Sequence, residues 1–183
     1  MHRELVAAAA LCTALCTALA TWAQSAPDFL PGTMGRPTVD PEWKEVEAPP
    51  PPALRTMDLV TVDVSGAGEL RYGVDPQSVE VGKDRVVRYV LVASSRSGAV
   101  NGIYEGVNCE RGEFRVFARS TGQGWRETPS EWKSLFEGGE ARHALAVAKA
   151  GACRGRTPNG DAAQVVRDLR TPLARKFGGS SAP

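Results

Sequence analysis

The chain has 183 residues, of which 22 are Lys or Arg and 21 are Asp or Glu, so its formal net charge at pH 7 is only +1. This balance argues against a nucleic-acid-binding surface, which needs a concentrated basic face, and against a polybasic attachment to membranes. Without an N-terminal leader the chain is still long enough for one domain with a hydrophobic core.

The N-terminal segment has the features of an export signal. Residues 5–20 form an apolar run behind Arg3, and Thr21 and Ala23 supply the small residues that signal peptidase reads. We therefore expect residues 1–23 to be a signal peptide that is cleaved, which would place the protein in the periplasm. The alternative is a membrane anchor, but a span needs about 20 apolar residues and stop-transfer charges are missing here.

Residues 24–53 are rich in proline and end in a run of four prolines at 49–52. Proline at this density blocks the hydrogen bonds of both helices and sheets, so we expect an extended tether that is polyproline II in its last part. Trp43 is an exception within it. We expect Trp43 to dock onto the folded domain, and the alternative is an exposed aromatic anchor for a partner.

A single α+β domain is expected over residues 54–171. It opens with a first strand at 54–64, in which alternate valines share one face, and short strands at 70–72 and 78–81 follow. Glycines and an Asp-Pro pair separate these strands from one another.

Three consecutive strands at residues 85–93, 100–109 and 113–119 are predicted to form an antiparallel meander. The first is apolar on both faces, as a central strand requires. In the second, Gly102 and Gly106 leave room for a bulge or for the close approach of another group. The third alternates apolar and charged residues, so we expect it to have one wet face.

Two helices are predicted after the meander, at residues 140–150 and 161–170. The first is rich in Ala and is closed by Gly151, and the second carries an apolar face of valines and Leu169. Residues 172–183 are expected to be a flexible tail. The fold class is therefore α+β, an antiparallel β-sheet meander with two C-terminal helices.

The four cysteines have different expected fates. Cys12 and Cys16 lie in the signal, and each follows Leu, so neither has the small residue that precedes an acylated cysteine and no lipoprotein is expected. Cys109 and Cys153 remain in an exported chain, where we expect them to form one disulfide worth about 4 kcal/mol in the chain-entropy model. A redox or metal site is the alternative, but neither cysteine has a second thiol beside it.

Few residues offer a catalytic mechanism. His143 is the only histidine outside the signal, so any nucleophilic triad would have to use it, and no G-x-S-x-G elbow is present. Phosphate loops, dinucleotide fingerprints and calcium loops are also missing. We expect no cofactor and no metal, and we do not expect an enzyme. The alternative is a periplasmic hydrolase that uses His143 or Glu105.

The carboxylates do not indicate a specific catalytic mechanism either. Glu105 shares a predicted strand face with apolar residues, so it is a buried acid of raised pKa, a residue at an edge position, or the partner of an arginine such as Arg88 or Arg115. Asp63 and Asp84 have no motif that links them, so nothing specific indicates a glycosidase.

Arginines and aromatic residues gather on adjacent predicted strands, where they could bind a peptide or an anionic ligand. The alternative is that they are ordinary cross-strand pairs on a wet face. The candidate surface consists of Arg88, Tyr89, Tyr104, Glu105, Arg115 and Phe117.

Several short motifs between Trp43 and Leu169 resemble the CNP-like family, the cryptic neisserial protein type. They are Trp43-Lys44-Glu45, the prolines at 49–52, the segments 74–78, 86–92, 97–99 and 104–106, and the single residues Cys109, Trp125, Trp132, His143 and Cys153. The resemblance implies an uncharacterised bacterial protein of the periplasm or envelope, with lipid-anchored members in part, and it carries over no catalytic residues. We therefore expect a non-enzymatic binding or accessory module of the cell envelope, with another envelope protein as partner.

Overall fold

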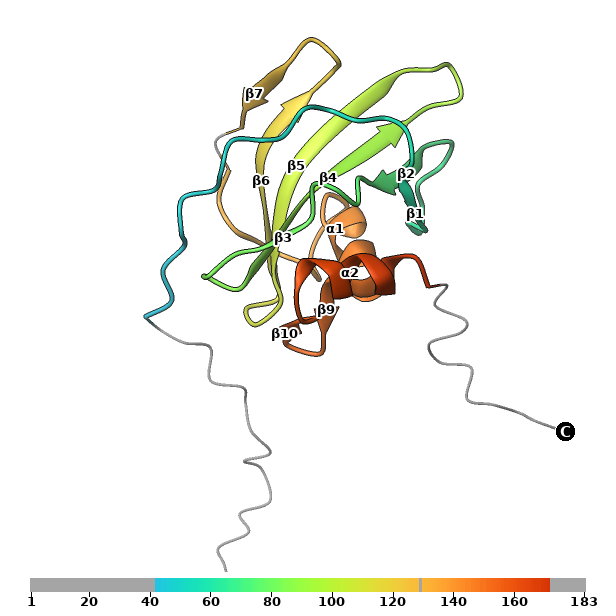
Figure 1. The fold of residues 1–183 in the computed structure, drawn as a ribbon. Coiled ribbons are helices and arrows are strands. Elements are labelled where there is room, and N and C mark those ends of the chain that lie inside the picture. The colour runs from blue at the N-terminus through green and yellow to red at the C-terminus, as the bar shows by residue number, and fades with distance from the viewer. Residues whose placement is uncertain (1–41, 129, 172–183) are drawn as a thin grey trace, which may run out of the picture. The chain divides into compact units, whose positions relative to one another are not determined.

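The structure, a computed structural model, describes residues 42–171 except Pro129. The predicted signal at 1–23, most of the predicted tether and the predicted tail at 172–183 lie outside these residues. In the described part an antiparallel sheet carries helices on one face and an extended N-terminal segment on the other (Figure 1).

The main sheet has eight strands in the order β1-β2-β4-β5-β6-β7, with β3 also paired to β4 and β8 to β6. A separate two-stranded sheet joins β9 to β10, and all pairings are antiparallel. The strands are β1 (Val60–Val62), β2 (Arg71–Val74), β3 (Glu80–Val81), β4 (Val86–Ser94), β5 (Val100–Asn108), β6 (Glu113–Ser120), β7 (Trp125–Glu127), β8 (Lys133–Ser134), β9 (Cys153–Arg154) and β10 (Thr157–Pro158).

The predicted meander is confirmed as β4, β5 and β6. Strand β4 lies at the centre, paired with β2 and β3 on one side and β5 on the other, and all of its residues except Ser94 are buried. The predicted first strand is shorter than expected. Its valines at 60, 62 and 64 are all buried, but only Val60–Val62 pairs with a neighbour.

Both predicted helices are present, and the first is divided. Helix α1 (Arg142–Val147) continues as a π-helical turn, Ala148–Ala152, and α2 (Ala162–Leu169) follows the β9–β10 hairpin. A Cβ atom at Gly151 would lie 2.7 Å from the backbone nitrogen of Leu169, so this glycine lets α2 pack directly on the π-turn. The Asp161 carboxylate caps α2 by accepting a hydrogen bond from the Gln164 backbone N–H.

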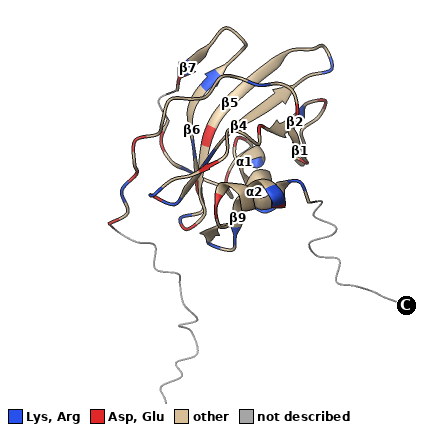
Figure 2. Ribbon diagram, viewed as in Figure 1, with Lys and Arg blue, Asp and Glu red and all other residues tan. Residues whose placement is uncertain are grey.

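Basic and acidic residues are interspersed along the described chain, on turns, on the helices and on the N-terminal segment (Figure 2). This distribution agrees with the near-zero net charge of the sequence. The sheet interior is mostly uncharged, which is why the few buried charges described below stand out.

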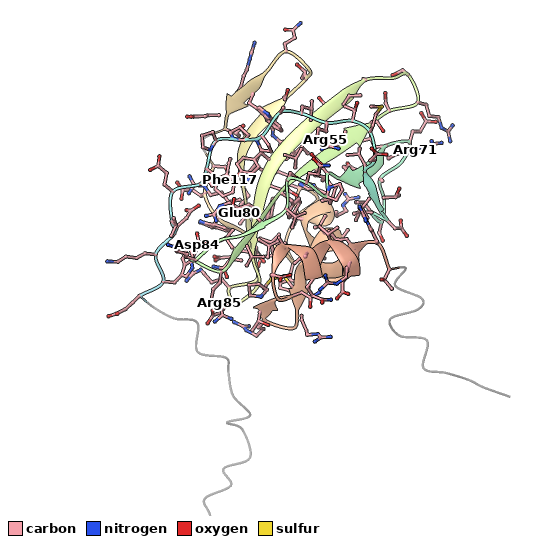
Figure 3. The ribbon with its side chains drawn as sticks, in the orientation of Figure 1. Arg55, Arg71, Glu80, Asp84, Arg85 and Phe117 are labelled. Carbon is pink, nitrogen blue, oxygen red and sulfur yellow. A yellow bond between two sulfur atoms is a disulfide. The ribbon has the colours of Figure 1, made fainter. Side chains whose placement is uncertain are left out.

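The N-terminal strap, residues 42–55, is extended, contains no helix or strand, and lies on the sheet face opposite the helices (Figure 3). The predicted docking of Trp43 is confirmed, because its indole N–H donates to the Asp84 carbonyl oxygen over 2.8 Å. Farther along, the Trp125 indole donates to the Pro52 carbonyl, and Leu54 packs on β5 over Gly102. These contacts hold the described part of the predicted tether against the sheet.

One face of β6, which was expected to be exposed to solvent, is partly covered. Arg115 and Phe117 are only partly exposed, because the Glu45 carboxylate binds Arg115 at 2.6 Å and Trp132 packs near Phe117. The prediction of a wet face was wrong for these two residues. The alternating polarity of residues 113–119 predicts a strand, but it does not show that other segments of the chain cover one face of that strand.

A β-bulge interrupts the pairing of β5 with β6 near the middle of the two strands. Tyr104 pairs with Ala118 and Glu105 pairs with Val116, so Phe117 has no partner across the ladder. The extra residue turns Phe117 toward the strap while Val116 stays in the helical core. The room that Gly106 leaves is filled by Phe117 and Val86.

We expect Gly106→Ala to destabilise the fold, because the added Cβ would lie 2.7 Å from Val86 Cγ1 and 3.0 Å from Phe117 Cε2. Overpacking of this kind costs about 1–3 kcal/mol. Urea unfolding measures the change, with the exposed β5 residue Asn101, changed to Ala, as the matched control. Equal midpoints for the two variants would show that the contact is not tight.

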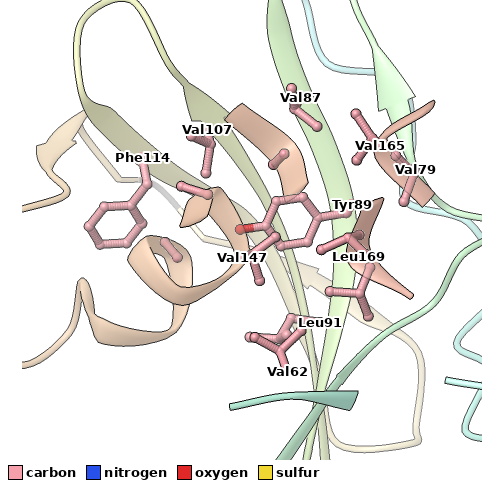
Figure 4. Packing of buried hydrophobic residues seen from close by; sticks show 14 of the residues in the cluster. Val62, Val79, Val87, Tyr89, Leu91, Val107, Phe114, Val147, Val165 and Leu169 are labelled. Carbon is pink, nitrogen blue, oxygen red and sulfur yellow. The ribbon is translucent and has the colours of Figure 1, made fainter. Parts of the chain in front are cut away.

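The helical face of the sheet forms the larger core (Figure 4). Tyr89 of β4 lies at its centre, between Leu91 of the same strand, Val147 of α1 and Leu169 of α2. A second, smaller cluster on the opposite face joins Tyr104 and its strand neighbours to the strap. The sheet is therefore buried on both sides, which explains the two apolar faces of β4.

Candidate functional site

The structure divides the six candidate surface residues between the two faces of the sheet. Tyr89 and Glu105 point into the helical core, whereas the other four, Arg88, Tyr104, Arg115 and Phe117, lie under the strap. Arg88, Tyr89, Tyr104 and Glu105 are at most 2% exposed, so in this conformation they do not form an open surface.

Glu105 and His143, named above for the hydrolase alternative, are in direct contact. His143 Nε2 of α1 lies 2.8 Å from Glu105 Oε2, and the Tyr89 hydroxyl donates to Glu105 Oε1 over 2.8 Å. Glu105 itself is 0% exposed. Its two partners are therefore His143 and Tyr89, and neither Arg88 nor Arg115 contacts it among the hydrogen bonds of the described residues.

Burial and the neighbouring carboxylate set the ionisation of this group. Burial, with the Glu105 charge and hydrogen bond, raises the pKa of Tyr89 well above its usual value, so Tyr89 stays a neutral donor. Burial alone would lower the pKa of His143, but the Glu105 charge and hydrogen bond outweigh it and the pKa is raised. The ring also stacks on Tyr72 and meets Phe114 edge-on.

This arrangement fits a structural link between helix and sheet better than catalysis. Both oxygens of Glu105 are occupied by protein groups, and the carboxylate is closed to solvent. The His143 side chain is 13% exposed, so only an edge of the ring reaches water. A general base needs to reach the proton that it removes.

We expect the contribution of His143 to stability to fall as pH rises. A pKa that is higher in the folded than in the unfolded chain gives stability that is fully present below about pH 6.5 and is lost as pH passes the folded pKa. Unfolding midpoints measured between pH 6 and pH 9 for the wild type and for His143→Gln test this. The difference between the two proteins should shrink toward high pH, and a difference that grows would contradict the ion pair.

Asp84 and Arg88 form a buried ion pair that the sequence did not reveal. The carboxylate accepts from both terminal nitrogens of Arg88, at 2.6 and 3.1 Å, and from the backbone N–H groups of Val46 and Val86. Arg88 also donates to the Val46 carbonyl and lies over the Phe117 ring. The Asp84–Arg88 pair, called the clip below, therefore binds the strap to the sheet through Val46.

The predicted disulfide is confirmed between Cys109 and Cys153, with a Cα–Cα distance of 5.7 Å. It joins the residue after β5 to the strand that follows the π-turn. Beside it lies a pocket of about 550 Å³, within the usual range for small-molecule sites. Its lining consists of Cys109, Arg111, Gly112, Leu135, Phe136, Leu145, Ala148, Lys149, Cys153, Gly155 and Arg156.

The walls of this disulfide pocket are mainly carbon and sulfur, and its charged lining residues are all basic. A larger hollow of about 670 Å³ along the β1–β2 hairpin is lined by both Asp63 and Arg71 and by several turn residues. Of the two, the disulfide pocket is the one that combines apolar walls with charge of one sign.

Metal and membrane sites find no support in the described residues. Between Glu42 and Thr171, apart from Pro129, no cluster of three or more His, Cys, Asp or Glu residues could hold a metal ion. No helix in the same part of the chain is both long and apolar enough to cross a bilayer.

Comparison with known proteins identifies a family that the chain matches. Residues 38–170 match the CNP1-like family, which agrees with the resemblance noted from the sequence and extends over the strap, the sheet and both helices. Neither a curated protein nor a solved structure matches the chain.

Proposed function

The chain belongs to the CNP1-like family, and we propose that it is an exported, non-enzymatic binding module of the cell envelope whose ligand site is the disulfide pocket. The observation that carries this proposal is the pocket itself, an apolar hollow of about 550 Å³ with Phe136, Arg111, Lys149 and Arg156 around it. Exposed aromatic rings and arginines are typical of binding sites.

Two further features support the proposal. The disulfide is the kind of bond that persists in oxidising compartments such as the periplasm, which agrees with the export signal expected at residues 1–23. In addition, the Glu105–His143 pair is enclosed between α1 and the sheet. It therefore holds the helix on the sheet, which favours a structural role for the pair over a catalytic one.

Photo-crosslinking in living cells tests the site. A crosslinking amino acid replaces Phe136, which is 74% exposed at the pocket, or Met57, which is 75% exposed and is not among the lining residues. We expect a reproducible adduct at position 136 that is absent at position 57. Equal labelling at both positions, or no adduct at 136, would overturn the proposed site.

Export is tested by the mass of the purified protein. A chain recovered from the periplasmic fraction is expected to begin at Gln24 and to carry no lipid. A chain that retains residues 1–23, or one that stays in the cytoplasm, would contradict the proposal.

A further inference from the structure

We infer that the ligand of the disulfide pocket is a single-chain anionic amphiphile, with its apolar chain in the pocket and its acidic head on Lys149, Arg156 and Arg111. This inference rests on the proposed function and adds the chemical class of the ligand. It follows from the walls of the pocket, from the charges at its rim and from the exposure of those charges.

The walls favour an alkyl chain. Three separate segments build them: the turn after β5, the loop after β8, and the helix α1 with the π-turn and β9. Leu135 is only 3% exposed and forms part of the floor together with Ala148 and the disulfide sulfur atoms. The Phe136 ring packs on the turn, where its Cε2 atom lies 3.0 Å from the position of a Cβ on Gly112.

Such walls are poorly suited to an extended peptide. A peptide brings one N–H and one C=O group per residue, and each must find a partner when it is buried. The side chains of Leu135, Phe136, Leu145 and Ala148 offer no donor or acceptor. An alkyl chain has no such groups and gains about 0.8 kcal/mol for each buried methylene.

The rim charges favour an acidic head group. The lining contains Arg111, Lys149 and Arg156, and no Asp or Glu. Lys149 has no ion-pair partner among residues 42–171, Pro129 aside, and Arg156 donates to the Glu110 carbonyl rather than to a carboxylate. Arg111 is partly neutralised, because its Nε binds Glu113 at 2.7 Å.

The exposure of these groups fixes the orientation of the ligand. Lys149 and Arg156 are exposed and Arg111 is half-buried, whereas Cys109, Leu135 and Ala148 at the floor are buried. A charged head at the rim therefore keeps its water while the chain displaces water from the floor. Charge-assisted hydrogen bonds from lysine and arginine suit carboxylate and phosphate heads alike.

Binding is measured by titration calorimetry with the full mature chain, residues 24–183, with its disulfide formed. The probes are dodecanoate, dodecan-1-ol as the neutral chain of equal length, and acetate as the head group alone, all below micelle-forming concentrations. We expect saturable one-to-one binding of dodecanoate, binding of the alcohol weaker by about tenfold, and no binding of acetate.

Two variants separate the head site from the chain site. The double variant Lys149→Gln/Arg156→Gln should weaken dodecanoate by about tenfold and leave dodecan-1-ol unchanged. Leu145→Gln should weaken both. The matched control is Arg96→Gln/Arg126→Gln, which removes two exposed arginines that do not line the pocket and should change neither. Thermal unfolding of each variant verifies the fold.

The outcomes separate the inference from the proposed function. Equal affinities for dodecanoate and the alcohol, or a loss of binding in the control, would overturn the anionic class. No binding of either long-chain probe, combined with a specific adduct at position 136, would overturn the amphiphile and leave the binding module standing. The absence of both binding and adduct would overturn both, and a protein adduct without amphiphile binding would point to a macromolecular partner instead.

Discussion

We expect Asp84→Ala to lower the free energy of unfolding by about 3–5 kcal/mol, because it leaves the Arg88 guanidinium buried without a counter-charge. The side chains of the pair are 2% and 0% exposed, so water does not replace the lost partner. Three groups lose their acceptor at once, namely Arg88 and the backbone N–H groups of Val46 and Val86.

The loss in the free energy of unfolding should be smaller when both charges are removed than when Asp84 alone is replaced. In Asp84→Ala/Arg88→Met no guanidinium remains to be desolvated, and the methionine retains apolar contact with Phe117. We therefore expect the double variant to be more stable than Asp84→Ala alone. Denaturant unfolding of the wild type, the two single variants and the double variant gives the coupling energy of the pair.

Equal stability of Asp84→Ala and the wild type would contradict this account, as would additive effects of the two single changes. A surface control comes from the exposed pair Glu69–Arg96, where Glu69→Ala should change stability by less than about 1 kcal/mol. The comparison sets a buried Asp–Arg ion pair against an exposed Glu–Arg ion pair in the same protein.

Acid should weaken the same clip. Burial raises the pKa of Asp84, but the bonds from Arg88 and from the backbone outweigh burial and the pKa is lowered. A lowered folded pKa gives stability that is present above about pH 4 and is lost as pH falls through the folded value. Because the Asp84 carboxylate also accepts from the Val46 backbone N–H, release of the strap should accompany this loss.

Local patterns were sufficient to predict most of the secondary structure. The apolar run of residues 85–93 predicted β4, alternating residues predicted β5 and β6, and the apolar stripe in residues 161–170 predicted α2, because these signals come from neighbours along the chain. The end of α1 was less predictable. Gly151 indicated a stop, but the π-turn that reaches Ala152 depends on the packing of α2.

Contacts between distant segments explain what the sequence did not reveal. An arginine of the neighbouring strands was one of the alternatives for Glu105, but its partners are Tyr89 and His143, and His143 lies 38 positions away on α1. Asp84 carried no motif. Three of its four hydrogen bonds come from Arg88 and Val86 nearby in the chain, but only the bond from Val46, 38 positions away in the strap, shows that the pair is covered. Such pairs are set by the register of strands and by segment packing, neither of which leaves a periodic signal.

The disulfide pocket was hidden for the same reason. Cys109 and Cys153 were predicted to pair, since they are the two cysteines beyond the predicted signal, but the pocket needs Phe136 and Lys149 as well. These residues lie in a loop and at the end of a helix, where single aromatic and basic residues are common. The pairing of β8 with β6 and the packing of α1 on the sheet bring them to the disulfide.

Loss of the disulfide is expected to have an effect as large as loss of the ion pair. Cys109→Ala/Cys153→Ala should lower the free energy of unfolding by about 4 kcal/mol, because the bond closes a loop with a sequence separation of 44 residues. The reduced chain would also lose the tie between the end of β5 and the segment after the π-turn. The pocket should therefore open before the sheet does.

Two measurements separate the global from the local effect. Thermal unfolding of the wild type with and without dithiothreitol should show a large drop in midpoint, whereas the double variant should not respond to the reductant. At a temperature where the variant remains folded, dodecanoate binding should still be weaker than in the wild type, because Cys109 and Cys153 form part of the pocket floor. An unchanged midpoint on reduction would contradict the stabilising role, and unchanged binding in the folded variant would show that the pocket does not depend on the bond. A large drop in stability with normal binding would assign the disulfide to the scaffold alone, so the pair of results decides whether the bond serves the fold, the site or both.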